Sequence, residues 1–364
     1  MDFDIQPNLL MREMPNSISL PRRFREEFGV LVGQFLQLQG SEELVLEVTI
    51  ALDPQQETAY ISPENFKKIK NQDITFKLLD VTLGCDPEFF IVWGWRNISA
   101  ATYLPFQGEI GSDGALGELR PMYGQHEDQV IANLRKLIPK IPRQLRRSPW
   151  ARSLPATGDK FTYEAHSFNF GTAAGFHVHL GIPPEILNTR KDFNRAAMSH
   201  IVQGLDWYVS VPLIPLEVNH QRRLGSNYGK PGDYRPSNMT LEYRTPGGFY
   251  LRSPKLARGL LGLSLAITEA VVSRMKVASK EFTTLHKLSA ADLQEILPIP
   301  HPEKIRGTLV DGNVKVAESQ LPSIYNEVQH LPNYQKHKGA IEEFFRAVET
   351  REQPGPDLLH NWKE

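Results

Sequence analysis

The stretch Gly84-Cys-Asp-Pro-Glu-Phe-Phe-Ile-Val, residues 84–92, decides the fold prediction. Its aromatic and β-branched residues behind a glycine predict a β-strand, in which successive side chains point to opposite faces of the sheet. Asp86 and Glu88 are two residues apart, so both carboxylates point to the same face. Such a pair is either a solvated strand face or part of a site, and the rest of the chain has to decide between these interpretations.

Three later segments repeat this spacing. Each is a short strand-like run that glycine or proline ends, and each places two ionisable side chains on one face: Glu118 and Arg120 in Gly117-Glu-Leu-Arg-Pro, His177 and His179 in Gly175-Phe-His-Val-His, and Glu242 and Arg244 in Leu241-Glu-Tyr-Arg-Thr-Pro. Taken singly, these are surface cross-strand pairs or hydrogen-bonded core histidines. Their joint appearance favours one functional surface that carries four carboxylates, two imidazoles and two guanidiniums.

This collection of groups predicts a site for a divalent cation and an anion. Neighbouring carboxylates raise each other's pKa by repulsion, and a divalent cation removes that penalty. Oxygen-rich ligands without cysteine suit Mg²⁺ or Mn²⁺, with imidazole as an occasional ligand. Arginine is planar and permanently charged, and it suits phosphate or carboxylate oxygens. Metal, phosphate and carboxylate recognition on one surface points to nucleotide-dependent chemistry.

Two loops extend the predicted site. Residues 108–117 contain four glycines around Asp113, so this backbone could approach a ligand closely, and we assign Asp113 to substrate binding. A second glycine-rich segment precedes the fourth strand and carries four cationic side chains, Arg222, Arg223, Lys230 and Arg235. A flexible cationic loop could close over phosphates or an anionic substrate. The other interpretation is an ordinary basic surface loop.

Strand runs and helices without regular βαβ alternation predict an α+β fold with an antiparallel sheet and flanking helices over residues 79–364. Residues 1–78 predict a small β-rich domain with two similar phrases, each a strand end followed by a helical turn: Ile18-Ser-Leu-Pro-Arg-Arg-Phe and Ile61-Ser-Pro-Glu-Asn-Phe. Helices are expected at 125–147, 191–211, 254–282, 323–331 and 338–351. The third of these is strongly apolar and predicts a buried core helix, whereas the tail 353–364, with two prolines, is expected to fray.

The composition argues against several classes of protein. The chain has 364 residues and 41 Lys plus Arg against 42 Asp plus Glu, so its net charge of -1 gives no global field that attracts nucleic acid or an anionic membrane. Cys85 is the single cysteine, which excludes an internal disulfide and a thiolate zinc cluster. No apolar run approaches the roughly 20 residues of a transmembrane helix, and no signal peptide is recognisable. We therefore expect a cytoplasmic protein without nucleic-acid or membrane partners.

At these residues the chain resembles the glutamine synthetase-type carboxylate-amine ligases, specifically the phage and bacterial amidoligases called COOH.NH2 ligase type 2. Residues 84–90 resemble the family's first metal-binding strand, and residues 175–179 resemble its histidine strand. Residues 235–248 resemble its closing arginine followed by a glutamate-any-arginine strand. The resemblance covers about residues 84–250, and the order of the motifs agrees as well as their content.

The resemblance implies an active site on an antiparallel sheet that holds ATP and two or three Mg²⁺ ions. It implies metal ligation by Asp86, Glu88, Glu118, His179 and Glu242. It implies phosphate contacts for Arg235, Arg244, His179 and His177, of which Arg235, Arg244 and His177 are assigned to catalysis. From their positions we add Arg120 and Lys230 to the nucleotide site, and Arg222 and Arg223 to an acidic-substrate site. Residues 1–78 do not resemble the N-terminal domain of glutamine synthetase, so a ring of subunits is not implied and the oligomeric state stays open.

The expected reaction is ATP-dependent formation of an amide or isopeptide bond through an acyl phosphate. The resemblance implies carboxylate and amine substrates, which we expect to be amino acids, peptides or peptidoglycan fragments. One alternative is a zinc hydrolase that uses His177 and His179 with an acid such as Glu118, because a pair of histidines suits Zn²⁺ at least as well as Mg²⁺. The other is a non-catalytic, phage-associated structural or binding protein that retains the ligase fold.

Overall fold

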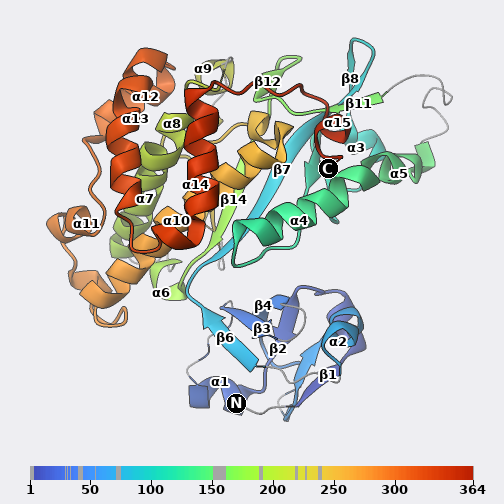
Figure 1. Ribbon diagram of the computed structural model, residues 1–364. Coiled ribbons are helices and arrows are strands. Elements are labelled where there is room, and N and C mark those ends of the chain that lie inside the picture. Colours follow the sequence, from blue (N-terminus) through green and yellow to red (C-terminus); the bar gives the residue numbers. More distant parts are fainter. Residues whose placement is uncertain are drawn as a thin grey trace.

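A small sheet near the N-terminus and a larger sheet flanked by helices make up the computed structural model of the protein (Figure 1). The structure describes residues 4–28, 30, 32, 34–39, 44–53, 55–70, 75–150, 161–187, 192–217, 220–225, 228–236 and 240–363.

The larger sheet consists, among the described residues, of eight strands in antiparallel pairings. Its strand order is β15-β16-β14-β7-β10-β9, and β8 and β11 also pair with β7. The bounds are β7 Thr82–Trp93, β8 Arg96–Ile98, β9 Ile110–Asp113, β10 Leu116–Leu119, β11 Phe161–Glu164, β14 Phe176–Gly181, β15 Tyr234–Pro236 and β16 Thr240–Tyr243. The central strand, β7, has 12 residues and includes the predicted strand 84–92.

The two faces of this sheet differ in chemistry. One face contributes alternate residues to the main hydrophobic core, among them Leu83, Cys85, Phe89, Leu119, Phe176, Val178, Leu180, Leu241 and Tyr243. The residues between them point to the opposite face, because side chains of a strand alternate. All four ionisable pairs predicted from the sequence belong to these intervening positions.

A layer of helices covers the core face of the sheet. Its central member, α10 (Pro254–Ala278), packs against β7 and β14 on one side and against α14 (Tyr334–Glu349) on another. Gly262 permits this close approach, because a Cβ built there would lie 2.5 Å from the Cβ of Ala340 on α14. The layer also includes α4 (Glu127–Leu137), which contacts α10 and β7.

By length and composition alone, α10 is long and apolar enough to cross a membrane. From the sequence we expected no such apolar run. The most apolar window of α10 is 83% buried inside the protein, as expected for the core helix that its sequence predicted. A buried core helix passes the same test of composition, so this single helix is weak evidence for a membrane span.

The remaining helices surround this layer. Their bounds are α3 Ala100–Tyr103, α5 Ile141–Arg146, α6 Pro184–Leu187, α7 Asp192–Leu205, α8 Val211–Leu213, α9 Gln221–Gly225, α11 Ala290–Ile296, α12 Pro302–Val310, α13 Val314–Gln329 and α15 Leu358–Asn361. The expectation that the C-terminal tail frays is wrong for its last turn. Leu358 and Trp362 are buried, and the Trp362 indole Nε1 donates a 2.8 Å hydrogen bond to the Leu251 carbonyl oxygen, so packing holds the tail in place.

The N-terminal region forms a six-stranded mixed sheet in the order β1-β5-β2-β4-β3-β6. The bounds are β1 Ile5–Pro7, β2 Ser17–Ser19, β3 Phe35–Gln39, β4 Leu44–Thr49, β5 Ala59–Ile61 and β6 Thr75–Leu79, with helices α1 Arg22–Phe28 and α2 Pro63–Ile69. Both similar phrases of the sequence form a strand followed by a helix, and Ser62 caps α2 by accepting a hydrogen bond from the Asn65 N–H. This sheet has its own apolar core.

The predicted fold class is confirmed: an α+β chain with an antiparallel sheet and flanking helices, joined to a small β-rich N-terminal region. Contacts between the N-terminal region and the rest of the described chain include packing of Met122 against the N-terminal core. Tyr123, which follows β10, donates a hydrogen bond to the Asn16 carbonyl oxygen, and Lys276 at the end of α10 lies 3.1 Å from Asp80. The division into domains at residues 78 and 79 stays a prediction.

Candidate active site

The strand register brings the predicted groups into one band across the sheet. Glu118 of β10 lies directly opposite Glu88 of β7, and Asp86 of β7 lies opposite His177 of β14. Further along, Glu242 of β16 is flanked by His179 of β14 and by Arg235 of β15. Directly opposed residues of an antiparallel pair have their Cβ atoms about 5 Å apart, so side chains from five strands gather on the face opposite the core.

Asp86 lies between the two imidazoles. Its Oδ1 atom is 3.1 Å from Nδ1 of His177 and 3.0 Å from Nε2 of His179. These three atoms are buried, yet in the described part of the chain none has a partner with the geometry of a hydrogen bond. Although burial raises the pKa of Asp86, the two histidines outweigh it and hold that pKa below its usual value, so the carboxylate is ionised.

Glu88 and Glu118 form the acidic end of the band. Both side chains are buried, and Glu88 Oε2 accepts a 2.5 Å hydrogen bond from the Gly175 N–H. Burial raises the pKa of Glu88, while His177 and the Gly175 hydrogen bond act in the opposite direction. Glu118 forms an ion pair with Arg120. A buried carboxylate whose pKa is raised gains from a neighbouring cation.

Glu242 is a buried acid at the other end of the band, where Arg235 and Arg244 supply positive charge. Arg235 donates two hydrogen bonds to it, from Nε to Oε2 at 2.6 Å and from Nη2 to Oε1 at 2.7 Å. Arg244 Nε lies 3.3 Å from the same Oε1. The Arg235 side chain is 63% exposed, so its guanidinium can leave Glu242 and contact a ligand in solution.

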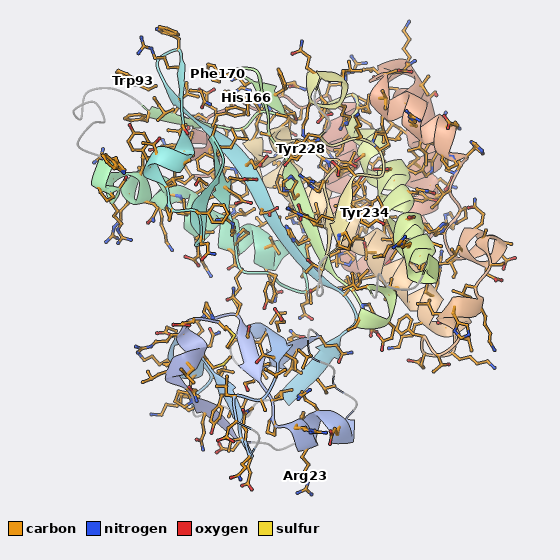
Figure 2. The ribbon with its side chains drawn as sticks, turned by 180° about the vertical axis from the view of Figure 1, so that it is seen from behind. Arg23, Trp93, His166, Phe170, Tyr228 and Tyr234 are labelled. Atoms are coloured by element: carbon orange, nitrogen blue, oxygen red, sulfur yellow. The ribbon has the colours of Figure 1, made fainter. Side chains whose placement is uncertain are left out.

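Tyr228 belongs to the band but was not predicted from the sequence. Its hydroxyl contacts Nε2 of His177 and lies 3.4 Å from Glu88 Oε2. Its ring lies between the guanidinium groups of Arg222 and Arg244, whose Cζ atoms are 4.6 and 4.8 Å from the ring centre. Figure 2 labels it near the middle of the larger sheet, whereas His166 and Phe170 lie toward the end marked by Trp93. A lone tyrosine in a polar loop gives no signal of this position.

We predicted that Arg222 and Arg223 lie on a flexible, open loop, but the structure holds both side chains in the interior. Arg222 and Arg223 are almost fully buried. Arg222 donates 2.7 Å hydrogen bonds to the carbonyl oxygens of Thr245 and Arg244, and Arg223 pairs with the buried carboxylate of Glu217. A buried guanidinium needs acceptors for its N–H groups, and these contacts supply them. They therefore anchor the segment to the protein interior.

The remaining predicted residues lie at the rim of the band. Asp113 is exposed at the end of β9, close enough for its charge to raise the pKa of Glu88. Lys230 is exposed, and its carbonyl oxygen accepts a hydrogen bond from the Thr245 hydroxyl. Arg120 Nη1 donates a 3.2 Å hydrogen bond to the Gly108 carbonyl oxygen. Their roles in substrate and nucleotide binding stay predictions.

The donor set of the band fits a divalent cation. Four carboxylates, from Asp86, Glu88, Glu118 and Glu242, lie within one face of the sheet, and Asp86 Oδ1 is a buried oxygen that lacks a hydrogen-bond donor of proper geometry. Oxygen ligands of this kind suit Mg²⁺ or Mn²⁺. Glu242 shares its two oxygens with Arg235, so a cation bound there would compete with that guanidinium for the charge of the carboxylate.

This band of acids, imidazoles and guanidiniums combines groups that suit a divalent cation with groups that suit an anion. The model of the family described as Phage phiEco32-like COOH.NH2 ligase-type 2 matches residues 83–363. The chain belongs to this family, which confirms the resemblance seen in the sequence and indicates a carboxylate-amine ligase.

Solved structures provide two further similarities. A bifunctional glutathione synthetase from Pasteurella multocida is 10% identical, with a TM-score of 0.38 over 78% of this chain and 51% of that one. A structure described as a novel glutamine synthase homolog is 11% identical, with a TM-score of 0.35 over 85% of this chain and 82% of that one. The chain thus spans about half the length of the glutathione synthetase. A comparison with curated protein sequences gave no significant match.

Removal of the Tyr228 hydroxyl tests the part this residue plays. We expect Tyr228→Phe to lower the rate of ligation by about tenfold, or ~1.4 kcal/mol, because His177 loses the partner of its Nε2 atom. Tyr234→Phe is the matched control, since Tyr234 lies on β15 and packs against the core. Steady-state kinetics of both variants provide the measurement, and equal rates for the two would remove Tyr228 from the site.

Proposed function

We propose that the protein is an ATP-dependent carboxylate-amine ligase that uses Mg²⁺, or Mn²⁺, and forms an amide or isopeptide bond. The observation that carries this proposal is the register of the larger sheet, which aligns Glu118 with Glu88, Asp86 with His177, and Glu242 with His179 and Arg235 on a single face. Membership of a COOH.NH2 ligase family supports the same reaction.

The acids of the band would hold the divalent cation, which offsets the negative charge of phosphate oxygens during phosphoryl transfer. Asp86 and Glu88 are the best placed, because both lie on the central strand, where Asp86 is opposite His177 of β14 and Glu88 is opposite Glu118 of β10. Arg235 and Arg244 lie at the other end and would stabilise the charge of the transferred group. Lys230 and Arg120, at the rim, would contact the nucleotide.

The proposed reaction has two steps, phosphorylation of the carboxylate and attack by the amine. An oxygen of the substrate carboxylate attacks the terminal phosphorus of ATP, and ADP leaves, which gives an acyl phosphate. The amine nitrogen then attacks the acyl carbon, phosphate leaves with the bonding electron pair, and the nitrogen loses a proton. A carboxylate resists attack because of its charge, and phosphorylation supplies the leaving group that the second step needs.

The donor set favours this reaction over a zinc hydrolase. The band places four carboxylates beside His177 and His179, and this excess of oxygen donors suits Mg²⁺ or Mn²⁺ better than Zn²⁺. Zinc sites of hydrolases instead place histidine nitrogens around the metal, with few carboxylates. The four acids that the band retains favour a ligase over a binding protein that has lost its activity.

We propose carboxylate and amine substrates drawn from amino acids, peptides or peptidoglycan fragments, and a cytoplasmic location, where ATP is available. The test is to incubate the full chain with ATP, Mg²⁺ and panels of these compounds, and to measure ADP and product by mass spectrometry. We expect ADP to appear only when a carboxylate and an amine are both present. ADP formation that no amine stimulates, across a broad panel, would count against ligation.

A further inference from the structure

A second cluster of metal-ligand side chains lies among the helices on the core side of the larger sheet. His126 and Glu127 stand at the beginning of α4, and His337 lies on α14. Their ligand atoms are all within 4.8 Å of one another. Within the described ranges of the chain, this is the one group of three or more such residues that meets this distance.

One of the two distances between these donors matches the separation of two ligands of one small cation, whereas the other is that of a hydrogen bond, which would lengthen by about 0.5–0.7 Å when a metal binds. Nδ1 of His337 lies 2.8 Å from Glu127 Oε2, and Nδ1 of His126 lies 3.5 Å from the same oxygen. Ligands that are about 2.0–2.2 Å from a tetrahedral zinc ion are separated by about 3.3–3.5 Å. The two imidazole rings are stacked, with centroids 5.4 Å apart.

Glu127 supplies an independent reason to expect a ligand. Its side chain is 1% exposed, and its Oε1 atom is buried without a hydrogen-bond partner among the residues that the structure describes. Gly262 of α10 leaves room for this carboxylate, because a Cβ built there would lie 3.1 Å from Glu127 Cδ. A buried carboxylate oxygen that lacks a donor is a group that a cation would satisfy.

His337 has the second contact that metal-binding histidines usually have. Its Nε2 atom lies 3.0 Å from Glu269 Oε2 on α10, and Glu269 is in turn held by Lys336 and Asn333. A carboxylate at one ring nitrogen fixes the tautomer and directs the lone pair of the other nitrogen at the metal. Here that other nitrogen, Nδ1, is the one that faces Glu127.

We propose that His126, Glu127 and His337 bind a divalent transition metal, with Zn²⁺ as the best fit to two imidazoles and one carboxylate. The metal takes the place of the proton that Nδ1 of His337 otherwise shares with Glu127, and Nδ1 of His126 exchanges the 3.3 Å hydrogen bond that it accepts from the Asp128 N–H for the metal. The His126 side chain is 28% exposed, which gives a metal access from solvent and leaves a fourth position open to water. The bound metal joins the first turn of α4 to α14, two elements more than 200 residues apart in the chain.

The test uses the full chain, stripped of metal by a chelator and titrated with Co²⁺ in the presence of excess Mg²⁺. Magnesium occupies oxygen-rich sites, whereas cobalt bound to imidazoles gives visible absorption. We expect about one equivalent of cobalt per chain, displaced by Zn²⁺, and a higher unfolding temperature with Zn²⁺ than without it.

The decisive variant is His126→Asn. Asparagine is a good N-cap, so the variant keeps the cap that His126 provides to the Asp128 N–H while it removes the imidazole. We expect it to weaken cobalt binding more than about 100-fold and to abolish the zinc-dependent shift in unfolding temperature. His330→Asn, at an exposed position at the end of α13, is the control and should bind cobalt as the wild type does.

The outcomes separate this site from the candidate active site. Asp86→Asn is expected to keep the cobalt spectrum, since Asp86 lies on the opposite face of the sheet. If the spectrum is lost in Asp86→Asn and kept in His126→Asn, the cobalt occupies the band on the sheet and the proposal is overturned. Absence of cobalt binding by the wild type overturns it as well, and the cluster is then only a hydrogen-bonded contact between helices.

Discussion

Asp86→Asn is expected to lower ligation about 100- to 1,000-fold, or ~3–4 kcal/mol of transition-state stabilisation. The substitution keeps the size of the side chain but removes the charge that the two imidazoles and a divalent cation would share. Asp86 Oδ1 is the one oxygen that both His177 Nδ1 and His179 Nε2 approach within 3.1 Å. Its loss therefore affects both histidines as well as metal binding.

The measurement is amine-dependent ADP formation at saturating ATP over a series of Mg²⁺ concentrations. The pKa of Asp86 is held below its usual value, so the carboxylate is ionised throughout the neutral range. Against the effect of burial, Asp86 raises the pKa of His179, so Asp86→Asn lowers that pKa and the loss of activity should vary with pH where His179 titrates. Asp311→Asn is the matched control, as Asp311 is exposed at the end of α12. An Asp86→Asn enzyme that retains most of its activity would falsify the assignment of Asp86 as a metal ligand.

Arg223→Met is expected to reduce the free energy of unfolding by about 3–5 kcal/mol, the largest effect on stability that we predict. Arg223 and Glu217 form an ion pair in which the side chains are 1% and 2% exposed. Methionine fills a similar volume, but it leaves the Glu217 carboxylate buried, with Ser167 Oγ as the hydrogen-bond donor at 3.1 Å. An uncompensated buried charge is the cause of the loss.

The double variant Arg223→Met/Glu217→Leu distinguishes this cause from a simple packing defect. Since the second change removes the unpaired charge, we expect it to restore most of the lost stability, despite the loss of the acceptor for Ser167. Urea unfolding of the wild type and the two variants gives the free energies of unfolding, provided that the slope of free energy against urea concentration is the same for all three. A double variant that is less stable than Arg223→Met would show that the ion pair is not the source of the effect.

The sheet and its face could be predicted because strand periodicity is local. Asp86 and Glu88 are two residues apart, as are His177 and His179, so each pair shares a face of its strand. This follows from the sequence without any information about the neighbouring strands. The order of the motifs agreed with that of a known family, and the family match confirms this resemblance. The roles of the individual residues stay predictions, since a shared face does not say which atoms contact a ligand.

The helical layer was predicted less well. The helix expected at 323–331 begins nine residues earlier, at Val314, and continues through Pro322. Proline normally ends a helix because it lacks an N–H group, but Pro322 is exposed, so water can bond the carbonyl group that the proline leaves without a donor. Tertiary packing of the helix against its neighbours outweighs the local signal.

Contacts between distant segments could not be predicted at all. Glu127 and His337 are 210 residues apart, and Tyr228 and Glu88 are 140 residues apart. The burial of Arg222 and Arg223 was missed for the same reason. A glycine-rich basic segment is usually solvated. The cost of burying the two arginines is offset here by their partners in the fold, Glu217 and the carbonyl groups of Thr245 and Arg244.

The position of Tyr228 has a thermodynamic consequence for the acids of β7. Asp86 contacts His177, His177 contacts Tyr228, and Tyr228 lies 3.4 Å from Glu88, so a closed loop of polar groups returns to the strand where it began. Asp86 and Glu88 are therefore not independent ligands. Substitutions at the two positions should be non-additive, and any apportioning of binding energy between them depends on the order in which they are changed.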